Sequence, residues 1–444
     1  MLRQFFEANG DSLIYGDIAK NLLRHGRYAL SGGPNELSST LIRLPGYPLF
    51  LAICFRLFGM ENYAAAAWVQ IALELGGCLL LADFARRIAP PALKGGAAHA
   101  TLWLAALCPF TAIYAANPLA EAPTLFALAL ALWSAARFTE RPGWGDALAF
   151  TFAVTFAALL RPDGALAAVA LVPALLVGLR GVPELRRVGR MALVCLLLAL
   201  APFAAWTWRN WRVFHVFEPL APQSATDPGD PVYPGWERWV KTWCLDFVST
   251  YNVYWNVPGN ELEVKDLPER AFDSPEQYNE TLALAEDYDR NGFALTPELD
   301  GRFGRLAEER MAAHPLRSYV WLPLGRVADM WLRPRVENLP IDLDWWVYDH
   351  HNAETRFSWF YAGLNALYLL LGCVGLWLRP RLWPWMLAYM LLRSAMLLTI
   401  TGPEARYTLE CFPMLFALGG VAVAGVGNRA AALWRKWTSQ ERGA

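Results

Sequence analysis

The chain has 444 residues, a net charge of −1, and a composition that is 55% hydrophobic and only 18% charged. Water-soluble proteins carry about 25% charged residues, so this composition argues against an ordinary soluble globule. The absence of a basic excess argues against a nucleic-acid partner, and the 21 tryptophans favour a protein with rings at a membrane–water boundary.

Apolar segments near the length of a membrane-spanning helix, about 20 residues, recur along the chain. Their ranges are 63–83, 97–116, 119–138, 146–160, 163–180, 189–208, 357–377, 382–400 and 407–427. The pattern divides the chain into a first extracytoplasmic loop with amphipathic helices (1–62), a membrane region (63–208), a soluble insert (209–356) and a C-terminal membrane region with a basic tail (357–444). We therefore expect an all-α polytopic membrane protein with a mixed soluble extracytoplasmic insert.

Basic residues cluster in alternate loops between these segments, which places those loops in the cytoplasm. They are Arg86, Arg87, Lys94, Arg137, Arg141, Arg180, Arg186, Arg187, Arg190, Arg379, Arg381, Arg429, Arg435, Lys436 and Arg442. The segment 1–62 then lies outside the cytoplasm, although no export signal follows Met1. We expect that an initial transmembrane helix is missing from this chain; the alternative is that 47–59 enters the membrane without crossing it.

Charged residues near the predicted helix ends converge on the extracytoplasmic side. They are Asp11, Asp17, Arg43, Glu121, Arg161, Asp163, Glu404 and Arg406. Charges close to a bilayer are costly and usually functional, so the set predicts an outward-facing polar cavity.

Each charge also has a purely structural interpretation. Asp11 and Glu121 would each stabilise the N-terminus of a helix. Arg161 and Asp163 would form a local ion pair, as would Glu404 and Arg406. The intramembrane Arg393 would extend towards the interface, or meet a phosphate.

Several motifs resemble those of GT-C glycosyltransferases, specifically the dolichyl-phosphate-mannose protein mannosyltransferase-like family 39 and the bacterial aminoarabinose transferases of lipid A. The motifs are Asp11-Ser-Leu-Ile-Tyr15-Gly-Asp17-Ile-Ala, Arg43-Leu-Pro45-Gly46-Tyr47-Pro48-Leu-Phe-Leu-Ala, Arg161-Pro-Asp163-Gly, Trp208-Arg209-Asn210 and Arg406-Tyr407. The resemblance implies an integral multi-pass enzyme of the inner or plasma membrane that takes a sugar from a polyprenyl phosphate on the extracytoplasmic side. It also implies that Asp11 is the catalytic aspartate and that Glu121 is a second acidic residue of the site, although Ser12 stands where many relatives have another acidic residue.

This chemistry assigns roles to the remaining charges. A carboxylate at Asp11 would accept the proton of the acceptor hydroxyl, and transfer would invert the sugar. Arg43, Arg161 and Arg406 would stabilise the departing phosphate. Glu121 would position a donor hydroxyl or bind a metal. The predicted substrate pocket also includes Tyr15, Tyr47, Asp163, Glu404 and Tyr407.

The partners expected are a polyprenyl-phosphate-linked sugar, membrane lipids and a glycan, lipid or protein acceptor, with no nucleic acid. No metal site and no cofactor are predicted, since His350 and His351 are adjacent and lack ligand spacing; a divalent cation at the carboxylates stays open. The seven cysteines form no disulfide framework and are expected to pack as apolar residues.

The insert contains a helical stretch, 302–332, that is expected to rest on the bilayer as an interfacial helix. Its aromatic runs Trp236–Trp243 and Tyr251–Trp255 would line a carbohydrate site or, as we prefer, pack in a core. Three other functions remain open from the sequence: a transporter or flippase of lipid-linked sugars, an envelope-glycan ligase or polymerase, and a non-catalytic membrane scaffold.

Overall fold

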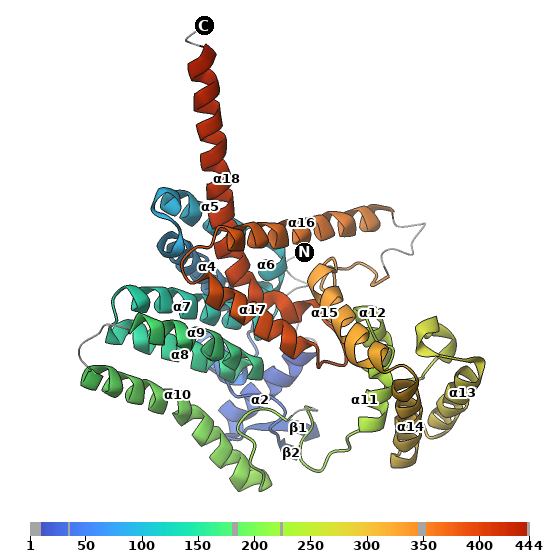
Figure 1. The fold of residues 1–444 in the computed structure, drawn as a ribbon. Helices are drawn as coiled ribbons and strands as arrows, with labels where there is room; N and C mark the ends of the chain where they lie inside the picture. The colour runs from blue at the N-terminus through green and yellow to red at the C-terminus, as the bar shows by residue number, and fades with distance from the viewer. Residues whose placement is uncertain (1–9, 34–35, 180–184, 223–224, 345–351, 442–444) are drawn as a thin grey trace. The chain divides into compact units, whose positions relative to one another are not determined.

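The computed structural model describes residues 10–33, 36–179, 185–222, 225–344 and 352–441 (Figure 1). These residues form two compact units. Unit 1 contains the chain up to Asp230, Leu367–Leu392 and the chain from Leu409, and unit 2 contains Pro231–Ala366 and Arg393–Thr408. Helices α16 (Asn352–Trp377) and α17 (Trp383–Leu397) each contribute residues to both units.

Unit 1 consists of helices with one small hairpin. Its elements are α2 (Asp11–His25), β1 (Ala29–Gly33), β2 (Glu36–Ser39), α3 (Gly46–Phe58), α4 (Tyr63–Ile88), η1 (Pro91–Leu93), α5 (Lys94–Ala106), α6 (Pro109–Ala116), α7 (Glu121–Glu140), α8 (Trp144–Leu160), η2 (Pro162–Ala165), α9 (Leu166–Gly178), α10 (Leu185–Phe214) and α18 (Phe412–Glu441). Helices α7, α8 and α9 lie side by side in Figure 1.

All nine predicted apolar segments contain helix. Among the described residues, five helices are long and apolar enough to cross a membrane: α4, α7, α10, α16 and the one ending in α18. The segment predicted as 97–116 is instead two helices, α5 and α6, bent by 51°, because Pro109 cannot donate to the preceding turn. Helices α8, α9 and α17 have 17, 13 and 15 residues, shorter than the about 20 that a perpendicular span requires.

Burial separates central from peripheral helices. The apolar window of α7 is 72% buried, whereas that of α10 is only 6% buried. Helix α10 exposes Leu193, Leu197 and Trp208 among other large apolar side chains, a surface that requires lipid rather than water around it. The all-α membrane fold predicted from the sequence is therefore confirmed.

The predicted cytoplasmic loops of α4, α7 and the 378–382 turn meet in unit 1. Glu140, at the end of α7, pairs with Arg87 at 2.5 Å and with Arg381 at 3.1 Å. Glu121 and Glu140 are the two terminal residues of the 20-residue helix α7. The basic loops and the acid Glu121 thus lie at opposite ends of this helix.

The hairpin of β1 and β2 was not predicted. The strands pair antiparallel with Ala29 opposite Ser39, and the register shifts between Ser31 and Gly33. Asp17 of α2 accepts hydrogen bonds from the Ser31 amide at 2.7 Å and its hydroxyl at 3.0 Å, so this acid fixes the hairpin to α2.

Unit 2 is helical throughout its described residues. Its main helices are α11 (Pro234–Lys241), α12 (Phe247–Ser249), α13 (Pro275–Arg290), α14 (Pro297–Ala313) and α15 (Leu322–Leu332), with short turns η3 (Thr250–Tyr254), η4 (Val264–Asp266), η5 (Glu269–Ala271), η6 (Arg317–Trp321) and η7 (Ala405–Cys411), the last of which ends in unit 1. Trp236, Trp239 and Trp243 are buried in its core, which confirms the packing interpretation of that run, whereas Tyr251 and Trp255 are about half exposed. The predicted helix 302–332 is broken near Pro315 into α14, η6 and α15.

Candidate active site

Asp11 is the first residue of α2. The preceding Gly10 has a φ of +48° and provides no side-chain cap, so the chain turns sharply and Asp11 lies in the first turn, where a negative charge is favoured. Arg43 Nη2 lies 2.7 Å from Asp11 Oδ1, and the two side chains remain 22% and 30% exposed. The pair is accessible from outside the protein.

Backbone hydrogen bonds hold the corner that carries Arg43. The Tyr28 hydroxyl donates to the carbonyl of Arg43 at 3.0 Å. Arg209 of α10 donates to the carbonyls of Thr40 and Tyr28, both at 2.7 Å. The guanidinium of Arg209 also lies over the rings of Tyr28 and Trp206. Arg209 thus stabilises the loop that carries Arg43.

Two glycines allow this corner and the Arg161 turn to approach α8. A β-carbon on Gly46 would lie 2.5 Å from the carbonyl oxygen of Leu159. A β-carbon on Gly164 would lie 2.3 Å from the carbonyl oxygen of Ala157. Both distances are shorter than those that real β-carbons keep from neighbouring atoms. The backbone at Gly46 therefore packs directly against the end of α8, which precedes Arg161.

Gln70 connects α3 to the turn that precedes Glu121. Its side-chain oxygen accepts from the Tyr47 hydroxyl at 2.6 Å, and its nitrogen donates to the carbonyls of Ala115 and Asn117. The turn is thereby fixed, and α7 begins at Glu121, which is only 3% exposed. A carboxylate is favoured at such a helix N-terminus.

Arg161 is surrounded by three carboxylates. Its Nη1 lies 3.1 Å from Glu121, and its Nε lies 3.3 Å from Asp163 and 3.1 Å from Glu410. The side chains of Glu121 and Glu410 are 3% and 2% exposed. The guanidinium of Arg161 thus contacts three carboxylates, two of which are almost fully buried.

Tyr15 lies between the two ion-paired groups. Its ring contacts Tyr47 edge-on at a centroid distance of 4.9 Å, and Arg43 lies 5.9 Å from its centroid. Burial raises the pKa of Tyr15 to about 12, opposed by the positive charge of Arg43 and increased by Asp11. The charges of Glu121 and Arg161 also act on this hydroxyl, so both groups share one neighbourhood around Tyr15.

The remaining predicted residues lie in unit 2. Arg406 pairs with Glu404 at 2.5 Å, and the Tyr407 hydroxyl donates to the same carboxylate. Arg393 donates to the Tyr407 carbonyl at 2.8 Å. The structure therefore brings Asp11, Arg43, Tyr15 and Tyr47 together with the Arg161 cluster in unit 1, and brings Glu404, Arg406 and Tyr407 together in unit 2; the meeting of the two sets stays a prediction.

Among the residues that the structure describes, no three His, Cys, Asp or Glu side chains are arranged to hold a metal ion. His350 and His351 lie outside these residues.

Three residues of the site were not assigned a role from the sequence. Glu410 follows the Arg406-Tyr407 motif and precedes an apolar helix, so its charge at a membrane boundary was a usable signal. Gln70 is a polar residue inside the apolar segment 63–83, which is a comparable signal. Arg209 was noted only within a motif, and the carbonyls that accept its hydrogen bonds are more than 160 positions away.

Part of this chain is similar to a known protein family. Residues 43–208 match the family described as dolichyl-phosphate-mannose-protein mannosyltransferase. No curated protein matches the chain significantly. Two solved structures of ArnT from Cupriavidus metallidurans, one in the apo state and one bound to undecaprenyl phosphate, are each 15% identical to the chain. They cover 93% and 94% of this chain and 72% and 73% of their own, with TM-scores of 0.35 and 0.37.

The matched segment includes Arg43, Gly46, Glu121 and Arg161, which are positioned around α8 in unit 1. The chain is accordingly a multi-pass membrane protein whose residues 43–208 are similar to the dolichyl-phosphate-mannose-protein mannosyltransferase family.

Proposed function

We propose that this protein transfers a sugar from a polyprenyl phosphate to a hydroxyl of a glycan, lipid or protein acceptor on the extracytoplasmic side of the membrane, with Asp11 as the base. The observation that carries the proposal is the accessible Asp11–Arg43 pair beside Tyr15. The transfer requires a carboxylate that accepts the proton and a guanidinium that stabilises the leaving phosphate, close to one another. The name of the matched family supports a polyprenyl-phosphate donor.

Arg43 is the side chain best suited to bind the donor phosphate. Its guanidinium contacts the Asp11 carboxylate and the Ile42 carbonyl and is partly exposed, and guanidinium groups bind phosphate in a two-pronged geometry. A phosphate dianion or diester at Arg43 would compete with Asp11 for the same N–H groups. Donor binding would thus release the Asp11 carboxylate towards the acceptor hydroxyl.

The transfer step then uses both groups at once. The acceptor oxygen attacks the anomeric carbon from the face opposite the phosphate, while its proton passes to Asp11. The bond from the anomeric carbon to the phosphate oxygen breaks, and polyprenyl phosphate leaves with the electron pair, stabilised by Arg43. Attack from the opposite face inverts the configuration of the sugar.

Arg161 has a different role in this proposal. Three carboxylates contact its guanidinium, and negative charges this close disfavour a phosphate at Arg161. We assign Arg161 to holding Glu121 and Asp163 in position, with Glu121 oriented towards the hydroxyls of the donor sugar. Arg406, with Glu404 and Tyr407, remains the second predicted phosphate contact.

A donor-cleavage assay on the purified full chain tests the proposal. Undecaprenyl-phosphate mannose and undecaprenyl-phosphate aminoarabinose serve as labelled probes, and released undecaprenyl phosphate is measured. Asp11→Asn should lower the rate by about 10²–10⁴-fold, the usual contribution of a general base. Glu36→Gln, which changes an exposed acid of the same unit, should leave the rate unchanged.

Unchanged release by Asp11→Asn would refute its role as the base. Movement of intact lipid-linked sugar across a vesicle membrane without release would refute the transferase and support a transporter. Repeating the assay with a chelator tests whether a divalent cation at the carboxylates contributes.

A further inference from the structure

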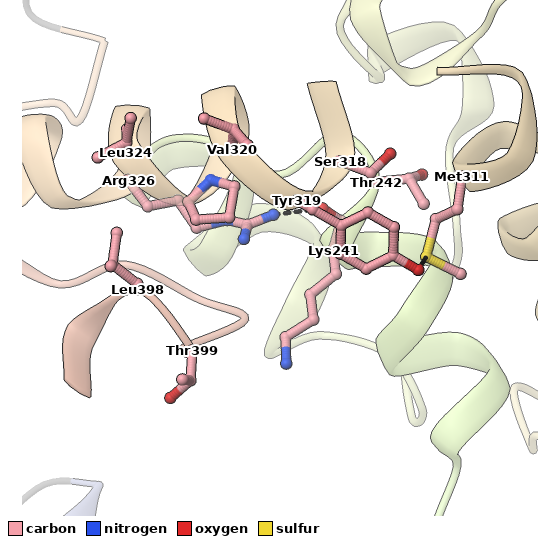
Figure 2. Close-up of a pocket in the computed structure, with 11 residues that line it drawn as sticks. Lys241, Thr242, Met311, Ser318, Tyr319, Val320, Leu324, Arg326, Leu398 and Thr399 are labelled. Atoms are coloured by element: carbon pink, nitrogen blue, oxygen red, sulfur yellow. Dashed lines mark hydrogen bonds between the residues drawn. The ribbon is translucent and has the colours of Figure 1, made fainter. Parts of the chain in front are cut away.

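A pocket of about 570 Å³ lies in unit 2, among α11, α14, η6, α15 and the turn after α17 (Figure 2). Its volume is within the range of small-molecule sites. Its lining residues are Lys241, Thr242, Met311, Ser318, Tyr319, Val320, Pro323, Leu324, Arg326, Leu398 and Thr399. The lining thus contains two cations and no acid, and most of the other side chains are apolar.

Lys241 supplies the accessible charge. In Figure 2 its side chain extends past the ring of Tyr319, and its ammonium ends away from the other labelled side chains. No carboxylate of the described residues lies within ion-pair distance of this ammonium. Burial lowers the pKa of Lys241, with a further contribution from the charge of Arg326, and Glu237 on the same helix acts in the opposite direction.

Arg326 adds a second positive charge that is fixed in place. Its guanidinium donates to the carbonyl of Cys244 at 2.7 Å and to the carbonyl of Lys241. The side chain is 2% exposed, and within the described part of unit 2 its partners are carbonyls rather than carboxylates. Its charge is therefore not neutralised, and it increases the positive potential at the inner end of the pocket.

An exposed apolar surface adjoins the pocket. The side chains of Leu316, Tyr319, Val320, Trp321 and Leu324 are 68%, 69%, 39%, 66% and 48% exposed. They lie on η6, on the residue before it and on the first turn of α15, and Tyr319, Val320 and Leu324 also line the pocket. A face of this kind, with Trp and Leu beside basic residues, is typical of segments that lie at a bilayer surface.

We propose that this pocket binds the phosphate headgroup of an anionic lipid, with Lys241 as the contact and the acyl chains along the exposed face of η6 and α15. The pairing of unneutralised cations with apolar walls favours an amphiphile over a free anion, since a free anion gains nothing from Leu324 and Leu398. The inference does not depend on the transferase activity, because lipid binding here requires no cleavage of a donor.

Photolabelling of the full chain tests the assignment. The probe is a phosphatidic acid carrying a diazirine in its acyl chain, and the labelled peptides are mapped by mass spectrometry. We expect label on η6 and α15, reduced about fivefold or more in Lys241→Gln. Lys241→Arg keeps the charge and should retain the label.

Lys265→Gln is the matched control, because Lys265 is an exposed lysine of the same unit. It should leave the label unchanged. Leu398→Trp fills the pocket without altering charge and should also reduce labelling. Melting temperatures of all variants show that a loss of label is not a loss of fold.

Three outcomes would overturn the proposal. Equal labelling by a phosphatidylcholine diazirine probe would show that the face merely rests on lipid without a headgroup site. Displacement of the label by excess inorganic phosphate would assign the pocket to free phosphate. Unchanged labelling in Lys241→Gln would remove Lys241 from the contact.

Discussion

Arg161 shares one guanidinium among Glu121, Asp163 and Glu410, and two of these acids are almost fully buried. Ionised groups lose their hydration when buried, so the contact with the guanidinium stabilises each carboxylate. Arg43, by contrast, forms an exposed pair with Asp11, and exposed pairs contribute little to stability. The two arginines therefore differ in exposure: we propose that Arg161 stabilises the site and that Arg43 binds the ligand.

Arg161→Ala should destabilise the protein by about 3–5 kcal/mol, the usual effect of removing one partner of a buried ion pair. The measurement is thermal melting of the purified chain in one detergent. Arg27→Ala, which removes an exposed arginine of the same unit, serves as the control and should melt like wild type.

The double variant Arg161→Ala with Glu410→Gln should recover part of the loss, because it removes one of the uncompensated acids. An Arg161→Ala protein that melts like wild type would show that the three carboxylates do not depend on this guanidinium.

At the scale of elements, the close approach of α3 to the end of α8 sets the geometry of the site. Gly46→Ala would place a methyl group 2.5 Å from the Leu159 carbonyl oxygen, so the helices must separate. We expect a lower melting temperature and slower donor cleavage, since the shift would move Arg43 relative to Arg161.

Gly95→Ala is the matched control for this change. Gly95 lies near the start of α5 with open space where a β-carbon would be, and alanine is favoured over glycine in a helix by about 1 kcal/mol. The control should melt at or above the wild-type temperature; equal destabilisation by both variants would refute the packing argument.

Helix α15 carries an acid that makes the stability of unit 2 depend on pH. Burial raises the pKa of Asp329 from 3.8 to about 7, although Arg333 opposes the shift. Between these values the folded state binds more protons than the unfolded state, so stability contributed at this position falls as the pH rises from about 4 to about 7.

Asp329→Asn cannot ionise and should therefore gain stability relative to wild type, more at pH 8 than at pH 5. Each kcal/mol corresponds to about 2–4 °C in the melting temperature of a domain of this size. Asp266→Asn, at an exposed position of the same unit, should show no such difference between the two pH values. A gain for Asp329→Asn that is larger at pH 5 would contradict the assignment.

Local sequence signals predicted many of these elements correctly. The helix starting at Asp11, the helix following Pro45, and the aromatic core of unit 2 all follow from caps, corners and apolar patterns within about ten residues. The hairpin of β1 and β2 was missed because its strands are short and its stabilising partner, Asp17, is on a helix. The bend between α5 and α6 had a local signal in Pro109.

For the molecule as a whole, the sequence predicted which charges would gather but not how they would pair. Alternation of basic loops placed Glu121 and Arg161 on one side, and the structure joins them. The sequence could not indicate that Glu410, about 250 positions later, contacts the same guanidinium, because pairing between distant parts of the chain leaves no local pattern. The sequence predicted Arg43, Arg161 and Arg406 alike as phosphate ligands, and these roles stay predictions.

The central claim is that the Asp11 carboxylate is paired with Arg43, the proposed phosphate-binding side chain, until the donor binds. It is tested most directly by the affinity of the full chain for undecaprenyl phosphate, measured in a Lys241→Gln background so that the pocket of unit 2 contributes little. Asp11→Asn removes the competing carboxylate and should bind this lipid more tightly than the background protein, while Arg43→Gln should bind it at least about tenfold more weakly. Weaker binding by Asp11→Asn, or unchanged binding by Arg43→Gln, would contradict the account.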